Sequence, residues 1–88
     1  MRVIFSPRAE KELKKITKID QIALARKIRL IKDEAFNLQE EKLSGFKNIF
    51  RVRVSNYRIV YRKTSQEIYI ILIGHRKDIY NLVNKLLR

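Results

Sequence analysis

The sequence contains no cysteine, a single histidine and a single proline, and only two of its 88 residues are glycine. Without cysteine, the chain excludes a disulfide scaffold, a thiolate zinc site and a cysteine nucleophile. Internal repeats, Gly/Ser-rich linkers and low-complexity segments are also absent, so we expect one domain over residues 1–88. A hydrophobic content of 45% is enough for such a domain to fold around one core.

Long apolar segments are missing as well. The longest, Ile68 to Ile73, has six residues, whereas a helix that spans a bilayer needs about 20. No apolar segment follows Met1 and Arg2, so the sequence gives no sign of an export signal. We therefore expect a cytoplasmic protein that does not associate with a membrane.

Acidic residues are scarce: nine Asp and Glu face 21 Lys and Arg, which gives a formal net charge of +12. Charge of one sign on a small domain repels itself, and a polyanionic partner would relieve the repulsion. A basic surface selected for solubility alone would mix the two signs. Instead, no acid lies between Glu41 and Glu67, and that segment holds Lys42, Lys47, Arg51, Arg53, Arg58, Arg62 and Lys63.

The N-terminal half predicts a short strand followed by two helices. Arg2 to Phe5 is typical of a strand, and Ser6-Pro7 favours a helix start, with Ser6 as cap and Pro7 at the first helical position. This helix is expected to run to about Thr17. Asp20 is the expected cap of a second helix, whose apolar stripe is Leu24, Ile28, Ile31, Ala35 and Leu38. Together the two form a helical hairpin.

In the C-terminal half, the hydrophobic pattern changes to the two-residue period of β-strands. Strands are predicted over Phe50 to Val54, Tyr57 to Lys63 and Ile68 to Ile73, and Gly74 is expected to end the last one. That last strand is apolar on both faces and so belongs inside the sheet. Asp78 to Leu87 favours a terminal helix. The predicted fold is α+β, β-α-α-β-β-β-(α), with the helical hairpin on one face of a mostly antiparallel four-stranded sheet.

A two-residue turn at Ser55-Asn56 would fix the register of the hairpin that it closes. Arg53 would then face Arg58, and the apolar residues that alternate with them would form the core face. Like charges directly opposite each other destabilise a sheet, and an anion held between them would explain the pair. On this register, the residues on the face away from the core are Arg51, Arg53, Arg58 and Arg62.

The segment after the last strand adds further polar groups. It contains His75, Arg76 and Tyr80. Histidine is the side chain whose ordinary pKa suits general-base work near neutral pH, although a single histidine also occurs as a surface or core filler. For Tyr80 two roles stay open: packing of the terminal helix, or stacking of a base and orientation of a phosphate.

Four stretches together resemble the RelE/ParE toxin superfamily. They are Leu43-Ser44-Gly45-Phe46, the alternating Phe50 to Val54, the hairpin strand Asn56 to Tyr61, and Ile73 to Arg76 with Tyr80 after it. The resemblance implies a toxin of a type II toxin–antitoxin system, with a small acidic RelB-like antitoxin as partner in a hetero-oligomer. The sequence lacks the usual clusters of metal ligands, which favours a metal-independent reaction, and we expect no cofactor.

In the RelE branch, the resemblance implies an mRNA interferase that works in the ribosomal A site and contacts mRNA and rRNA. There the 2′-hydroxyl attacks the adjacent phosphate, which leaves a 2′,3′-cyclic phosphate and a 5′-hydroxyl. Arg58 and Arg76 match the phosphate-binding arginines of that branch, and Tyr80 matches its C-terminal tyrosine. The expected RNA-binding residues are Arg51, Arg53, Arg62 and Lys47.

The sequence departs from the RelE pattern at one point that matters. Arg51 and Arg53 stand where that branch often has lysines, and arginine stays protonated, so it cannot serve as a general base. His75 is then the expected base. Arg58 and Arg76 would stabilise the charge on the phosphorane, and Arg76 or a group of the A site would protonate the leaving oxygen.

Two other functions remain open from the sequence. The ParE branch shares the fold, and the resemblance to it implies inhibition of DNA gyrase without RNA cleavage. The second alternative is an inactive relative that binds RNA.

Overall fold

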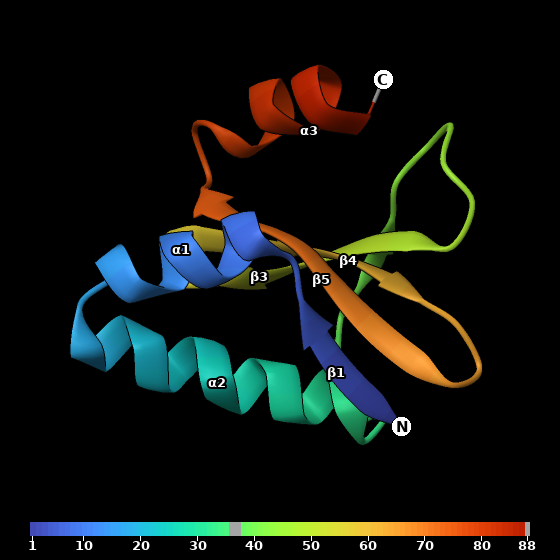
Figure 1. Cartoon of the computed structure of the whole chain (residues 1–88), viewed down its shortest axis with the longest axis horizontal. Helices are drawn as coiled ribbons and strands as arrows, with labels where there is room; N and C mark the ends of the chain where they lie inside the picture. Colours follow the sequence, from blue (N-terminus) through green and yellow to red (C-terminus); the bar gives the residue numbers. More distant parts are fainter. Residues whose placement is uncertain (36–37, 88) are drawn as a thin grey trace.

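The computed structural model describes residues 1–35 and 38–87, and within them the chain forms three helices and five strands (Figure 1). In chain order these are β1 (Arg2–Phe5), α1 (Pro7–Lys15), α2 (Lys18–Lys32), β2 (Glu41–Lys42), β3 (Ile49–Val54), β4 (Tyr57–Lys63), β5 (Glu67–His75) and α3 (Ile79–Leu87). The predicted α+β class is confirmed. The sheet has one strand more than expected, because β2 comprises only two charged residues and leaves no pattern in the sequence.

The strands lie in the order β1-β5-β4-β3-β2, and β1 is parallel to β5 while the other neighbours are antiparallel. β5 therefore sits between β1 and β4, as its apolar composition predicts. Figure 1 shows β1 beside β5, so the first and the last strand of the chain are neighbours in one sheet. None of the described helices is long and apolar enough to cross a membrane.

Ser6 begins α1 as predicted. Its Oγ accepts a hydrogen bond from the backbone N–H of Ala9 at 3.0 Å and donates one to the carbonyl of Ile71 at 2.7 Å. Pro7 occupies the first turn, where it forfeits no hydrogen bond. One hydroxyl thus caps the helix and ties it to β5.

The second helix differs from the prediction at both ends. It begins at Lys18 with Thr17 as its N-cap residue, and Asp20 lies inside the first turn, where its carboxylate accepts from Thr17 Oγ1 at 3.2 Å. It ends at Lys32, and Glu34 has the left-handed φ of 53° that ends a helix. Ala35 and Leu38 therefore lie outside the helix, although Leu38 is still buried in the core.

The main core lies between the helical hairpin and one face of the sheet. Leu24, Ile28 and Ile31 of α2 meet inward side chains of the strands, and the predicted alternation along β3 and β4 is confirmed. The strand residues of this cluster, buried or partly buried, include Phe50, Val52, Val54, Tyr57, Ile59 and Tyr61.

α3 packs on the other face of the sheet, whereas the prediction placed helices on one face only. Ile79 and Val83 join Val60, Leu72 and others in a second buried cluster. In Figure 1, α3 (red) lies above the sheet and α2 (teal) below it. An irregularity between Val60 and Tyr61 shifts the register of β4 on β5, so that two consecutive residues, Ile71 and Leu72, belong to this second cluster.

Gly74 does not end β5, which continues to His75. A Cβ at Gly74 would lie 3.0 Å from Cδ1 of Ile79 and 3.4 Å from Cδ1 of Leu82. The glycine therefore lets α3 approach the sheet closely, which is a packing role rather than a break in the strand.

Candidate functional site

A cavity of about 200 Å³ lies beside α3 and is lined mainly by polar side chains. Residues from β2, β3, β4, α3 and the segment before β2 contribute to it: Gln39, Glu41, Arg51, Arg53, Arg58 and Tyr80. Three of these six residues are arginines. The cavity is therefore a concave, positively charged site on a rigid antiparallel hairpin.

The β3–β4 hairpin brings its arginines together in the predicted register. Arg53 pairs directly with Arg58, and the two-residue turn between the strands contains Ser55 at a φ of 54°. A positive φ in such a turn matches the right-handed twist of the two strands. The register confirms that Arg51, Arg53, Arg58 and Arg62 face away from the main core.

Arg58 has a pKa below the ordinary value of an arginine. Partial burial is the largest cause, followed by the positive charges of Arg53, Arg51 and Arg76. Its Nη1 donates a hydrogen bond to the carbonyl of Tyr57 at 3.0 Å, which fixes the guanidinium at the sheet. The depressed pKa means that the folded protein disfavours this cation, so a bound anion would stabilise the site.

Arg51 is held from two sides. Its Nη2 donates to Oε2 of Glu41 at 2.6 Å, and its guanidinium lies over the ring of Tyr80 at 4.9 Å from the ring centre. The hydrogen bond and the charge of Arg51 lower the pKa of the Glu41 carboxyl. Arg51 thus links β2, β3 and α3 in one contact.

Arg76 reaches the same charge cluster from the end of β5. Its backbone N–H donates to the carbonyl of Asn56 at 2.7 Å, which holds it at the hairpin turn, and its charge contributes to the lowered pKa of Arg58. Tyr80 is half exposed and lines the cavity. The structure therefore brings Arg51, Arg53, Arg58, Arg76 and Tyr80 to one region.

His75 lies elsewhere. It pairs with Tyr57 in the sheet, whereas Arg58 pairs with Gly74, and directly paired residues project from the same face. Its ring meets the ring of Tyr57 edge-on, with centres 6.1 Å apart, and its Nδ1 accepts from the backbone N–H of Lys77 at 3.3 Å. Tyr57 belongs to the main core, so His75 projects toward the helical hairpin and away from the arginines.

Two predicted RNA-binding residues also lie outside the cavity. Arg62 is near the other end of β4, where its guanidinium lies over the ring of Tyr69 at 5.8 Å from the ring centre. Lys47 belongs to the loop before β3 and lines a separate cavity with Gly45 and Phe46. If they contact RNA, they do so apart from the arginine cluster.

Two lining residues were not predicted from the sequence, Gln39 and Glu41, and of these Glu41 carries the charge. It pairs with Arg51 across β2 and β3. The only signal in the sequence is its place at the start of the acid-free segment, which says nothing about a partner.

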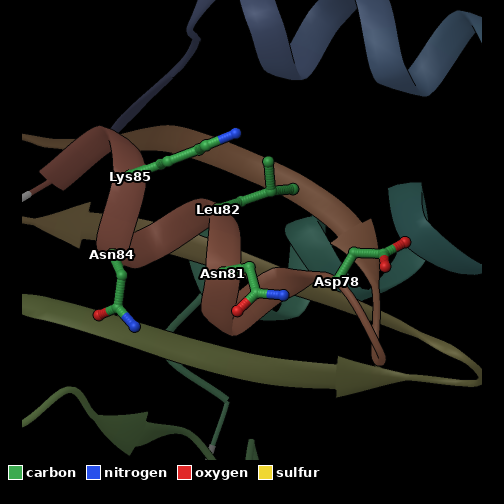
Figure 2. A pocket seen from close by; sticks show the side chains of 5 residues that line it. All are labelled: Asp78, Asn81, Leu82, Asn84 and Lys85. Atoms are coloured by element: carbon green, nitrogen blue, oxygen red, sulfur yellow. The ribbon is translucent and has the colours of Figure 1, made fainter.

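A larger cavity of about 710 Å³ lies along α3. Figure 2 shows Leu82 and Lys85 directed to one side of the helix and Asn81 and Asn84 to the other. Among the described residues that line this cavity, Lys85 is the only cation, whereas three arginines line the smaller cavity. Among the described residues, no group of three or more His, Cys, Asp or Glu side chains is arranged to hold a metal ion.

Comparison with known proteins identifies relatives over almost the whole chain. Residues 3–80 match the family described as the ParE toxin of type II toxin-antitoxin system, parDE. The chain is 32% identical over 89 residues to Toxin RelE3 of Methanocaldococcus jannaschii, an alignment that covers 92% of this chain and 97% of the relative.

Solved structures of similar fold include an isolated toxin and antitoxin–toxin complexes. The RelB–RelE antitoxin–toxin complex from Methanococcus jannaschii matches with a TM-score of 0.73 and 27% identity, over 90% of this chain and 96% of that one. The E. coli DinJ–YafQ complex has a TM-score of 0.77 at 18% identity over 91% and 99% of the two chains. The isolated E. coli RelE toxin has a TM-score of 0.70 at 22% identity over 99% and 98%.

Proposed function

We propose that this chain, which belongs to the ParE toxin family of type II toxin–antitoxin systems within the RelE/ParE superfamily, cleaves mRNA on the ribosome. The 32% identity to a toxin named RelE3 favours the RelE branch of the superfamily. In this proposal it enters the ribosomal A site as a metal-independent endoribonuclease. A 2′-hydroxyl of the mRNA attacks the adjacent phosphate, and the products carry a 2′,3′-cyclic phosphate and a 5′-hydroxyl. Translation stops as a result.

The observation that carries this proposal is the paired Arg53 and Arg58 at the cavity, with Arg51 beside them. A like-charge pair that lowers the pKa of Arg58 costs the folded protein stability, and a phosphodiester would neutralise it. Arg58 and Arg76 stabilise the charge that develops on the phosphorane, while Arg51 and Arg53 hold flanking phosphates. Tyr80 offers its ring to an adjacent base.

We further propose an acidic antitoxin as the partner that silences the protein. The net charge of +12 favours an acidic chain, and relatives of similar fold are known in complexes named for RelB and DinJ. Opposite charges would steer the two chains together, so their association rate should fall as salt rises.

Inhibition of DNA gyrase is the second candidate function. It is favoured by the family match, which names a ParE toxin, and by the position of His75 away from the arginines. A gyrase inhibitor needs no group that takes a proton.

The two functions separate in purified systems. We expect the protein to halt a purified translation system and to generate new mRNA 5′ ends within the A-site codon of stalled ribosomes. Arg58→Ala should abolish these ends, and Arg8→Ala, which removes one exposed charge of α1, should not. Unchanged translation together with inhibited DNA supercoiling by purified gyrase would replace the ribonuclease with the gyrase inhibitor.

A further inference from the structure

The arginine cavity contains one acidic side chain, Glu41, among the described residues that line it. The arginines around it cannot accept a proton near neutral pH, and His75 projects from the opposite face of the sheet. We propose that Glu41 is the general base that removes the proton from the attacking 2′-hydroxyl. This assignment rests on the proposed ribonuclease function and names the group that the reaction needs.

The contact with Arg51 gives Glu41 the geometry of a base. Arg51 holds Oε2 at 2.6 Å, and within the described part of the chain Oε1 makes no hydrogen bond. The Glu41 side chain is 68% exposed, whereas that of Arg51 is only 22% exposed. A fixed guanidinium thus orients a carboxylate whose second oxygen remains open to a substrate.

The charges that face Glu41 keep it ready to accept a proton. The hydrogen bond and the charge of Arg51 lower its pKa from the ordinary 4.5, burial opposes them, and the charge of Arg58 lowers it by a smaller amount. Arg53 and Tyr80 line the same cavity. The carboxylate is therefore ionised throughout the neutral range. When a phosphate of the mRNA binds Arg51, it offsets the charge that lowers this pKa, so Glu41 becomes a stronger base as the substrate arrives.

Glu41 takes the proton of the 2′-hydroxyl while the 2′-oxygen of the RNA forms a bond to phosphorus, and the bond from phosphorus to the 5′-oxygen breaks. The departing 5′-oxygen takes a proton from solvent, and Glu41 later returns its proton to solvent. The products are the 2′,3′-cyclic phosphate and the 5′-hydroxyl, with no change of oxidation state.

Single-turnover cleavage on programmed ribosomes tests the assignment. Glu41→Gln keeps the size of the side chain and an oxygen that accepts from Arg51, but it cannot take a proton in this range. We expect it to lower the cleavage rate by roughly 10²–10⁴ while ribosome binding stays within about threefold of wild type. Glu10→Gln on α1 removes the same charge outside the cavity and should cleave like wild type.

The pH profile separates a base from a merely positioning carboxylate. With Glu41 as base, the wild-type rate should stay level from pH 8 to pH 5.5. Arg51 lowers the pKa of the carboxyl in the free protein, and a bound phosphate moves it back toward the ordinary value, at which the carboxylate is still ionised at pH 5.5. An imidazole base would lower the rate about tenfold by pH 5.5. In Glu41→Ala, formate should restore cleavage and nitrate should not, since both pair with Arg51 but nitrate is far too weak a base.

The outcomes distinguish the two proposals. If wild type produces no A-site cleavage, the ribonuclease function fails, and the base fails with it. If wild type cleaves and Glu41→Gln cleaves within about threefold of it, only the base assignment is overturned. Equal rescue of Glu41→Ala by formate and nitrate would also overturn it, because Glu41 would then act only by holding Arg51.

Discussion

The same strands form both faces of the sheet, but the two faces have different roles. On the face of the helical hairpin, Val52 and Ile59 are buried and pair across β3 and β4. On the opposite face, the residues adjacent to these two in the same strands are Arg53 and Arg58, which pair directly although both are positively charged. Because successive side chains of a strand project from opposite faces, neighbouring residues of β3 and β4 contribute in turn to the core and to the cavity. One face is closed by two helices, and the other is only partly covered by α3.

The two faces also differ in how their charged groups are paired. On the helical-hairpin side, Tyr61 donates to Glu40, which also accepts from Lys63 at 2.6 Å, so each polar group has a partner of the right kind. At the cavity, the described lining residues include three arginines but only one carboxylate, that of Glu41. A surplus of one sign in a concave site is typical of a surface that binds the opposite charge.

The largest effect should come from the core face. Ile59 is fully buried, so Ile59→Ala leaves a cavity and should reduce the free energy of unfolding by about 2–5 kcal/mol. Urea denaturation followed by circular dichroism measures this loss. Below the unfolding transition, the cleavage rate per folded molecule should stay within about threefold of wild type, since no atom of the cavity is removed. A rate loss as large as that of an arginine variant would show that the faces are coupled.

Arg58→Gln should give the reverse pattern. Losing one group that stabilises the phosphorane typically costs on the order of 10²–10³ in rate. Because the fold lowers the pKa of Arg58, the charged form is disfavoured in the folded state, and removing the charge relieves that cost. The free energy of unfolding should therefore fall by no more than about 1 kcal/mol, which is the contribution of the hydrogen bond to the carbonyl of Tyr57. A large loss of stability with normal cleavage would contradict the division.

The difference between the two faces depends on the β3–β4 hairpin, a part of the fold that the sequence predicts well. The register of the β3–β4 hairpin is confirmed because a two-residue turn allows one pairing and alternation allows one inward set. The side on which α3 packs was not predictable in this way. β5 is apolar on both faces, so a short amphipathic helix can bury its stripe on either.

The site was harder to predict for a related reason. His75 and Arg76 are neighbours in the sequence, but the pairing of His75 with Tyr57 fixes its side chain on the core face. Glu41 reaches Arg51 through a strand of two residues, which is too short to produce a periodic signal. The face on which a side chain at a strand end projects, and a contact made through a strand of two residues, are therefore visible only in three dimensions.

Tyr61→Phe should have a smaller effect that depends on pH. Burial and the carboxylate of Glu40 raise the pKa of Tyr61 above the ordinary 10.0. The folded state thus holds the phenolic proton more tightly than the unfolded state, so this stabilisation is present below pH 10 and is lost as the pH rises above it. Tyr61→Phe removes the hydrogen bond, worth about 1 kcal/mol, and should make stability less sensitive to pH above 10. Thermal unfolding from pH 8 to 11 measures both, and identical pH curves would contradict the role of Glu40.

The smallest expected effect concerns Arg53, which is exposed and supplies a flanking phosphate contact in the proposed function. Arg53→Ala should weaken ribosome binding modestly and reduce the slope of log affinity against log salt by roughly 0.7–0.9, the value of one released counterion. Removing it also ends the direct opposition to Arg58, so the pKa of Arg58 should rise and stability should not fall. Arg8→Ala changes the net charge equally from α1 on the other face of the sheet. Equal slope changes in the two variants would mean that overall charge governs binding, whereas a change confined to Arg53→Ala would place the contact at the cavity.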